Sequence, residues 1–262
     1  GPRQLSVTKS GNGSGSVSSN PAGIDCGAAC SSANADFTYG TSVTLTATPA
    51  TGSDFTGWTG ACSGTSTCTA AMDEIRNVEA TFTLQKRILT LAKFESGSGT
   101  VTSSPAGIDF PTGASPCGLN GSCVSAQFDY GTIVTLTPTA SIGSDFTDWG
   151  GNDACQSFGP DQLCTLTMDQ DRYAEVEFEL QKKTLTATKS GNGTGTVAST
   201  PAGIDCGADC SNDYDYGTQI SLTATPGAHS VFTGWDGPCS GTSTCDVTME
   251  QEQEVTANFT LE

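Results

Sequence analysis

Cysteines are the residues of this chain whose type and spacing most clearly indicate chemistry. The twelve cysteines fall into six close pairs, which are Cys26 and Cys30, Cys62 and Cys68, Cys117 and Cys123, Cys155 and Cys164, Cys206 and Cys210, and Cys239 and Cys245. Disulfides persist in oxidising compartments, so an even number of closely spaced cysteines indicates an exported protein. We therefore expect all twelve to form disulfides in an extracellular or cell-surface setting.

The pairing of these cysteines is open from sequence alone. Each third of the chain carries four of them, and four cysteines allow three connectivities. We call the segment from one cysteine of a close pair to the other a bracket. Disulfides within each close pair are favoured, because both brackets are longer in the middle third, with five intervening residues in place of three and eight in place of five, yet the cysteines still occur as close pairs. A tetrahedral zinc site usually has tighter ligand spacing and is typical of reducing compartments, so we expect no metal at the cysteines.

Tryptophans are the candidate ligand-binding residues. One occurs in each third, after Phe-Thr-Gly or Phe-Thr-Asp, at Trp58, Trp149 and Trp235. An exposed indole face suits stacking on a sugar ring, which predicts a carbohydrate-binding module. The other interpretation is that each ring anchors a small core, because a small module needs its large aromatic side chains inside.

Metal binding and catalysis have little support in the sequence. Carboxylates are plentiful, with Asp25, Asp109 and Asp205 in a recurring Pro-Ala-Gly-Ile-Asp motif, but no segment has the spacing of a calcium loop. His229 is the single histidine, so no nucleophile and base recur together. We expect no enzyme and no cofactor, with calcium as the remaining alternative.

The charge balance excludes several partners. The chain has 28 Asp and Glu against 10 Lys and Arg, a formal net charge of −18. Nucleic acids and anionic lipid surfaces bind mainly through Lys and Arg clusters, so we expect this chain to bind neither. No apolar run approaches the length of a spanning helix, so we expect no membrane insertion in this segment. The opening Gly1-Pro2 resembles a remnant of tag removal, and we expect the chain to be a monomeric excerpt of a longer exported protein.

Internal repetition defines the domain organisation. The motifs around Pro-Ala-Gly-Ile-Asp, Tyr-Gly-Thr and Trp each occur three times in the same order. They predict three modules, at residues 4–85, 86–181 and 182–262. Apolar residues alternate within each module, as in Val78, Ala80, Phe82 and Leu84, which is typical of strands, and no convincing helix is present.

Turn and joint signals complete this prediction. The segments 11–13 and 191–193, both Gly-Asn-Gly, predict tight hairpins between the first two strands of their modules. Only Gln85-Lys86-Arg87 and Gln181-Lys182-Lys183 separate successive modules, which is too short for a flexible coil. The expected fold is mainly β, with three tandem small modules in a semi-rigid rod. The four basic residues at the joints would either bridge to carboxylates of neighbouring modules or lie in solvent.

The order of these motifs resembles the bacterial repeat domains of the internalin B-repeat group over essentially the whole chain. The resemblance rests on Gly-Asn-Gly-Ser-Gly, Pro-Ala-Gly-Ile-Asp-Cys, Phe-Thr-Gly-Trp and the Cys-Ser-Gly bracket at Cys62 and Cys239. It implies a β-grasp-like or small sandwich module in tandem on a bacterial surface or secreted protein. Module 2 departs from the pattern, since Phe110 stands where Cys26 and Cys206 are expected.

Two functions follow as hypotheses. The first is a non-catalytic, disulfide-stapled spacer or stalk in an adhesin-like surface or secreted protein. The second is a carbohydrate-binding module that uses the tryptophan loops. The partner would be a cell-surface or cell-wall glycan or a protein.

Overall fold

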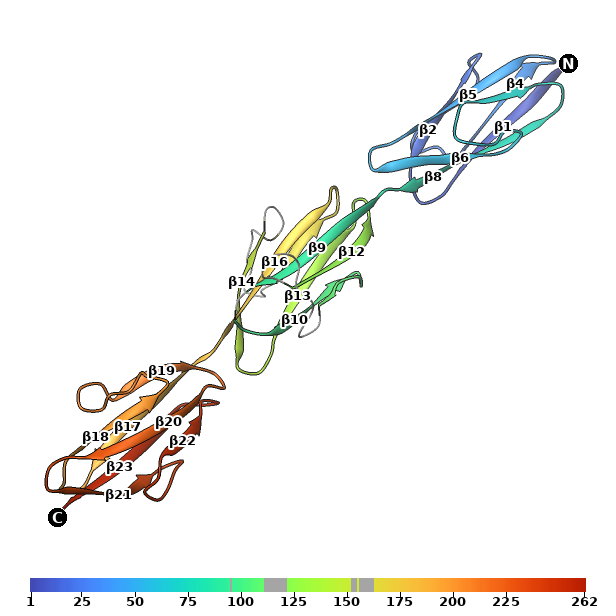
Figure 1. The fold of residues 1–262 in the computed structure, drawn as a ribbon. Helices are drawn as coiled ribbons and strands as arrows, with labels where there is room; N and C mark the ends of the chain where they lie inside the picture. The colour runs from blue at the N-terminus through green and yellow to red at the C-terminus, as the bar shows by residue number, and fades with distance from the viewer. Residues whose placement is uncertain (95, 111–121, 152–154, 156–162) are drawn as a thin grey trace.

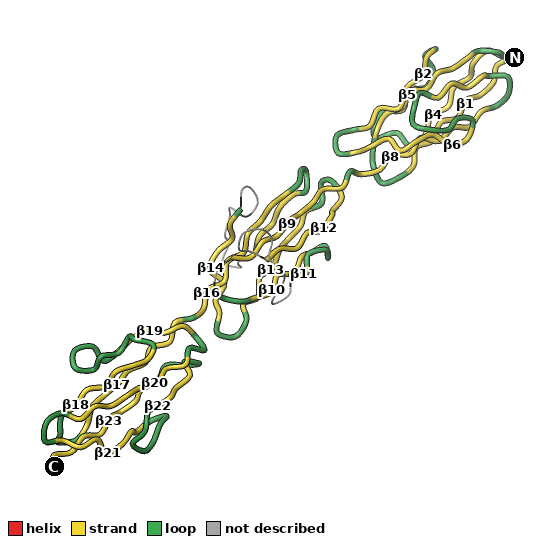
Figure 2. Tube along the Cα trace, in the orientation of Figure 1, coloured by secondary structure: helices red, strands yellow, loops and turns green. Residues whose placement is uncertain are grey.

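The structure is a computed structural model and describes residues 1–94, 96–110, 122–151, 155 and 163–262. Three β units follow one another in a row, with the two chain termini at opposite ends (Figure 1). The described part of the chain consists of strands and loops and contains no helix (Figure 2). The fold is therefore mainly β with small modules in tandem, as the alternating patterns predict.

Module 1 is a sandwich of two four-stranded sheets. Its strands are β1 (Pro2–Ser10), β2 (Gly15–Asn20), β3 (Asp25–Cys26), β4 (Ser32–Thr38), β5 (Ser42–Pro49), β6 (Ser53–Gly60), β7 (Cys68–Ala71) and β8 (Arg76–Leu84). The sheet orders are β4-β1-β8-β6 and β3-β2-β5-β7. All neighbours are antiparallel except β1 and β8, which are parallel over six residue pairs. The first and last strands of the module thus lie side by side in the middle of one sheet.

Modules 2 and 3 repeat this topology. Module 2 contains β9 (Lys86–Phe94), β10 (Gly99–Ser104), β11 (Asp109–Phe110), β12 (Ser122–Asp129), β13 (Ile133–Ala140), β14 (Ser144–Gly150), β15 (Cys164–Thr167) and β16 (Arg172–Leu180). Module 3 contains β17 (Lys182–Ser190), β18 (Gly195–Thr200), β19 (Ser211–Asp215), β20 (Gln219–Pro226), β21 (Ser230–Asp236), β22 (Cys245–Thr248) and β23 (Gln253–Leu261). Its second sheet has three strands, because a single bridge between Ala198 and Asp205 replaces the short edge strand.

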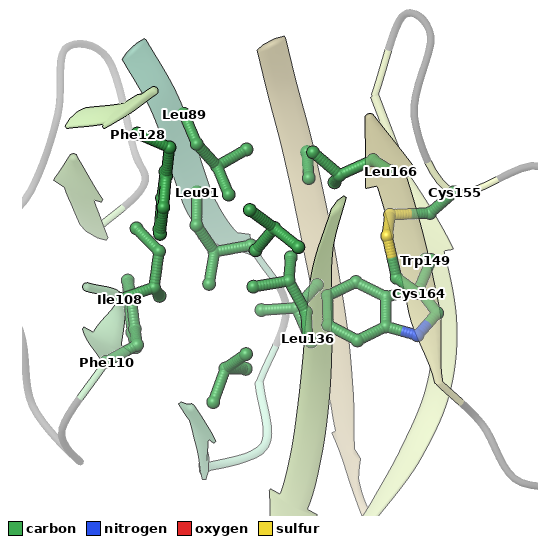
Figure 3. Packing of buried hydrophobic residues seen from close by; sticks show 14 of the residues in the cluster. Leu89, Leu91, Ile108, Phe110, Phe128, Leu136, Trp149, Cys155, Cys164 and Leu166 are labelled. Carbon is green, nitrogen blue, oxygen red and sulfur yellow. A yellow bond between two sulfur atoms is a disulfide. The ribbon is translucent and has the colours of Figure 1, made fainter. Parts of the chain in front are cut away.

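Each module has one core between its two sheets. Along β8 the side chains of Val78, Ala80 and Phe82 are buried, as the alternation predicts, and in the facing sheet Val43 and Leu45 of β5 are buried too. Figure 3 shows the equivalent packing in module 2, where Leu136 lies beside Trp149 and Leu166 beside the disulfide between Cys155 and Cys164. Leu89 and Leu91 of the other sheet lie near Phe128 and Ile108. Burial of alternate apolar residues on two facing sheets is the arrangement that stabilises a small sandwich.

The predicted hairpin at residues 11–13 is wrong. β1 pairs with β4 and β8, whereas β2 pairs with β3 and β5, so the Gly-Asn-Gly segment crosses from one sheet to the other. Gly11 has a φ of +91°, and a Cβ there would lie 1.9 Å from the carbonyl oxygen of Phe82. Asn12 Oδ1 accepts a hydrogen bond from the backbone N–H of Leu84 at 3.0 Å. The segment therefore closes the end of the sandwich against β8, and residues 191–193 do the same in module 3.

Candidate functional site

Both disulfide brackets of a module lie where the chain passes from one sheet to the other. The connection from β3 to β4 joins two edge strands on different sheets, and so does the connection from β6 to β7. Cys26 lies in β3 and Cys30 two residues before β4, while Cys62 follows β6 and Cys68 begins β7. The two disulfides therefore fasten the two crossings between the sheets.

The structure contains five disulfides among the described residues. They pair Cys26 with Cys30, Cys62 with Cys68, Cys155 with Cys164, Cys206 with Cys210, and Cys239 with Cys245. Each joins the two members of one close pair. Cys117, the expected partner of Cys123, lies outside the described residues. In module 2 the place of Cys26 is taken by Phe110, which pairs with Val101 as Cys26 pairs with Val17 and is fully buried.

Lys9 holds the loop of the first disulfide. Its Nζ donates hydrogen bonds to the carbonyl oxygens of Gly27 at 2.6 Å and Ala28 at 3.1 Å, inside the bracket, and to that of Gly15 at 2.7 Å. Partial burial of the ammonium group lowers the pKa of Lys9. The equivalent Lys189 of module 3 donates to Gly195 at 3.2 Å. The aligned lysines are thus donors to backbone carbonyls.

The three tryptophans are buried, with exposed fractions of 2% for Trp58, 4% for Trp149 and 3% for Trp235. Trp58 Nε1 donates a hydrogen bond to the carbonyl oxygen of Ser66 at 2.6 Å, and Trp235 Nε1 donates to that of Ser243 at 2.7 Å. Both carbonyls lie inside a disulfide bracket. The candidate ligand-binding role of these residues does not fit this geometry, because a sugar would need an open ring face.

The joint between modules 1 and 2 is a compact hydrogen-bonded unit centred on Gln85. Its backbone N–H donates to the carbonyl oxygen of Gly52 at 2.9 Å, and its Nε2 donates to Asp54 Oδ1 at 2.8 Å. Its own carbonyl oxygen accepts from the N–H of Tyr130 at 2.8 Å, and its Oε1 accepts from Arg87 at 2.5 Å. One residue therefore bonds to both modules through its backbone and its side chain.

An aromatic contact accompanies these bonds. A Cβ built on Gly52 would lie 2.0 Å from Cδ1 of Tyr130, so the tyrosine ring of module 2 packs directly on the backbone of module 1. Gly52 has a φ of +76°, a conformation that glycine adopts without strain. The guanidinium of Arg87 lies over the same Tyr130 ring, 5.6 Å from the ring centre, at a distance typical of a cation–π contact. Only a residue without a side chain leaves room for the ring.

The second joint has the same construction. Gln181 N–H donates to the carbonyl oxygen of Gly143 at 2.9 Å, its Nε2 donates to Asp145 Oδ1 at 2.8 Å, and its carbonyl oxygen accepts from Tyr216 N–H at 2.8 Å. A Cβ on Gly143 would lie 2.1 Å from the Tyr216 ring. We call the segments Gly52–Asp54 and Gly143–Asp145 acceptor turns, and Tyr130 and Tyr216 docking tyrosines. Sequence reasoning missed these residues, although the Gly-Ser-Asp segment before each of the two joints is a visible signal.

The basic residues at the joints mostly serve their own module. Lys86 forms an ion pair with Asp129 at 2.7 Å, and Lys182 forms one with Asp215 at 2.6 Å. In each case the two strands belong to the same module, so these ion pairs do not bridge neighbouring modules as the first alternative proposed. Such exposed pairs contribute little to stability.

Metal binding and membrane spanning are two further possibilities for the described part of the chain. No three His, Cys, Asp or Glu side chains lie together there in a way that would hold a metal ion. No helix that could span a membrane occurs there either. The absence of a cofactor, including calcium, stays a prediction.

The fold and the joints define a tandem array of disulfide-containing β-sandwich modules. A family model described as the divergent InlB B-repeat domain matches residues 4–86, 114–182 and 183–262. The chain therefore belongs to the divergent InlB B-repeat family, which confirms the resemblance drawn from its motifs. A comparison with curated proteins finds no match.

One solved structure shows the same fold at low sequence identity. The Bacillus anthracis TIE protein is 11% identical, with a TM-score of 0.60 over 100% of this chain and 51% of that chain. This chain thus spans about half the length of that one. BcpA, the major pilin subunit of Bacillus cereus, is 7% identical, with a TM-score of 0.38 over 100% of both chains.

Proposed function

We propose that this chain is a non-catalytic spacer or stalk segment of an adhesin-like bacterial protein that is secreted or displayed on the cell surface. The observation that carries the proposal is that the two joints share one hydrogen-bonded geometry, built on the same Gly-Ser-Asp segment and the same glutamine. A repeated joint of this kind fixes the direction in which each module follows the last. The array then separates whatever lies at its two ends by a set distance.

Two further features support this proposal. Disulfides at the sheet crossings suit an oxidising extracellular location, where a small Gly-rich module gains stability from covalent links. Family membership adds a tandem-repeat context. The carbohydrate-binding alternative is not proposed, because the tryptophans that would carry it are buried.

The test compares two double variants of the chain by small-angle X-ray scattering. In Gly52→Ala/Gly143→Ala, each new Cβ meets a docking tyrosine, so we expect the joints to open and the distribution of maximum dimensions to broaden. In the control, Gly64→Ala/Gly241→Ala, the replaced glycines lie away from both joints and have similar φ values of +87° and +81°, but a Cβ there meets no atom within 4 Å outside its two chain neighbours. Alanine in this conformation costs about 1–2 kcal/mol at each site in both variants.

The unmodified chain and the control should scatter as three modules laid end to end. A maximum dimension close to that of a single compact globule would contradict the spacer proposal. Equal scattering from both double variants would show that the docking tyrosines do not hold the joints.

A further inference from the structure

The N-terminal end of module 1 carries the same surface that docks modules 2 and 3. Tyr39 occupies the position of Tyr130 and Tyr216, directly after the strand that pairs with the first strand of its module. The guanidinium of Arg3 lies 5.5 Å from the centre of the Tyr39 ring, as Arg87 does for Tyr130 at 5.6 Å. Tyr39 is 59% exposed, whereas the two docking tyrosines are half-buried in their joints.

The C-terminal end of module 3 lacks the complementary surface. Its segment 229–231 aligns with the acceptor turns, since Ser230 pairs with Leu261 as Ser53 pairs with Leu84. His229 stands in place of the glycine, with a φ of +55°, and its Cβ would occupy the space that a tyrosine ring needs. Val231 stands in place of the aspartate that binds the joint glutamine.

The backbone at this end nevertheless keeps the shape of a joint. The N–H of Glu262 donates to the carbonyl oxygen of His229 at 3.2 Å, as Gln85 does to Gly52. The end therefore differs from an acceptor turn in three side chains, which are His229, Val231 and Glu262. These three replace the glycine, the aspartate and the glutamine that make the two joints.

We propose that the Tyr39 end of module 1 is a docking surface for a further B-repeat module that precedes Arg3 in the chain and ends in an acceptor turn and a glutamine. The module array thus has a direction, because it can be extended at the Tyr39 end by the same joint but not at the His229 end. This inference rests on the spacer function proposed above.

A second copy of the chain is not the occupant. In any copy, the acceptor turns at Gly52 and Gly143 are already filled by Tyr130 and Tyr216. The remaining end presents His229, whose side chain blocks the ring. A surface that fits Tyr39 must come from a different module with a free glycine.

The experiment uses the full chain labelled with 3-fluorotyrosine and measures the solvent exposure of each tyrosine by fluorine NMR with a soluble paramagnetic agent. An N-terminal extension places a copy of residues 86–180, followed by Gln-Lys, before Arg3. We expect the paramagnetic broadening of the Tyr39 signal to fall to that of Tyr130 and Tyr216.

The Tyr39 signal is assigned as the one that disappears in the variant Tyr39→Phe. The matched control carries Ala in place of the glycine that corresponds to Gly143 in the added copy, and it should leave Tyr39 exposed.

A C-terminal extension tests whether the same joint can form at the His229 end. A copy of residues 86–181 placed after Glu262 should leave its own docking tyrosine exposed. The triple substitution His229→Gly/Val231→Asp/Glu262→Gln should cover it.

Three results would overturn the inference. The first is a Tyr39 signal that stays exposed in the N-terminal extension while Tyr130 and Tyr216 stay protected. The second is a C-terminal extension that docks without the triple substitution. The third is protection of Tyr39 in the unextended chain with a doubled mass by light scattering, which would assign the surface to a second copy. Exposure of Tyr130 and Tyr216 themselves would instead contradict the spacer proposal, so the two failures are distinguishable.

Discussion

Individual side chains of this protein bond mainly to the backbone, and the buried indoles show why. Trp58 and Trp235 each fill a core and donate Nε1–H to a carbonyl oxygen within the disulfide bracket that follows. Aromatic side chains with a polar atom usually find such a partner when they are buried. The tryptophan and the bracket therefore form one local unit, in which the ring packs inward and the bracket supplies the acceptor.

Lys9 provides the residue-scale prediction. Replacement by methionine removes two hydrogen bonds to the loop of the first disulfide and a third to Gly15, so we expect amide exchange in residues 25–32 to accelerate, with a local cost of about 1 kcal/mol. The matched variant Lys189→Met removes a single longer bond and should change exchange in module 3 less. Hydrogen–deuterium exchange mass spectrometry measures both, and equal effects would argue against this role of Lys9.

The residue types alone predicted the disulfides and limited the roles of the tryptophans. Closely paired cysteines in an exported protein usually form disulfides, and a single tryptophan in a small module either fills the core or binds a ligand. The partners of these side chains were not predictable, since the acceptors at Ser66 and Gly27 are backbone atoms that any residue could provide. The role of Gln85 in the joint could not be predicted from sequence for the same reason. Two of its hydrogen bonds within the joint come from its backbone, and its side-chain partner Asp54 is 31 positions away.

The strands of each module were predictable from local sequence, but their pairing was not. The alternation in β8 predicted the strand and the buried side chains of Val78, Ala80 and Phe82 correctly, because a period of two follows from the pleat itself. Alternation does not reveal which strands pair. The Gly-Asn-Gly segment has the residues of a hairpin turn, yet β1 finds its partners in β4 and β8. That choice depends on long-range packing, which a local pattern does not contain.

The disulfide between Cys62 and Cys68 provides the element-scale prediction. Replacing both cysteines by serine frees the crossing from β6 to β7, and loss of so short a closed loop should destabilise module 1 by about 2 kcal/mol in the chain-entropy model. Exchange should accelerate first in the edge strand β7, while β1 and β8 in the middle of the other sheet stay protected. Module 3, with its own disulfides intact, is the internal reference. Equal acceleration throughout module 1 would show that this disulfide holds the whole sandwich rather than its edge.

The whole molecule is a row of modules with a strongly acidic surface. Its formal charge of −18 makes neighbouring molecules repel one another at neutral pH, which favours a monomer in solution. Because the Tyr39 and His229 ends do not fit each other, nothing in the described ends favours self-association.

Light scattering tests this charge effect. The second virial coefficient should be positive at neutral pH and low salt, and it should fall in 1 M salt, where the screening length is about 3 Å. Near the isoelectric point of about 4.1 it should become negative, because the net repulsion disappears. A dimer at neutral pH and low salt would contradict the expectation of a monomeric segment.

The parallel pairing of β1 with β8 has a mechanical consequence for a stalk under tension. The chain enters each module at the start of one strand and leaves at the end of its parallel neighbour, so pulling on the two termini loads this hydrogen-bond ladder in shear. In shear, all rungs of a ladder resist together, since their bonds lie across the direction of pull. The disulfides enclose short loops at the sheet crossings and take no part in this ladder. In single-molecule stretching we therefore expect three unfolding events whose forces are unchanged by a reducing agent, and forces that fall on reduction would place the resistance in the disulfides. A surface protein built from such modules would withstand flow through its backbone hydrogen bonds.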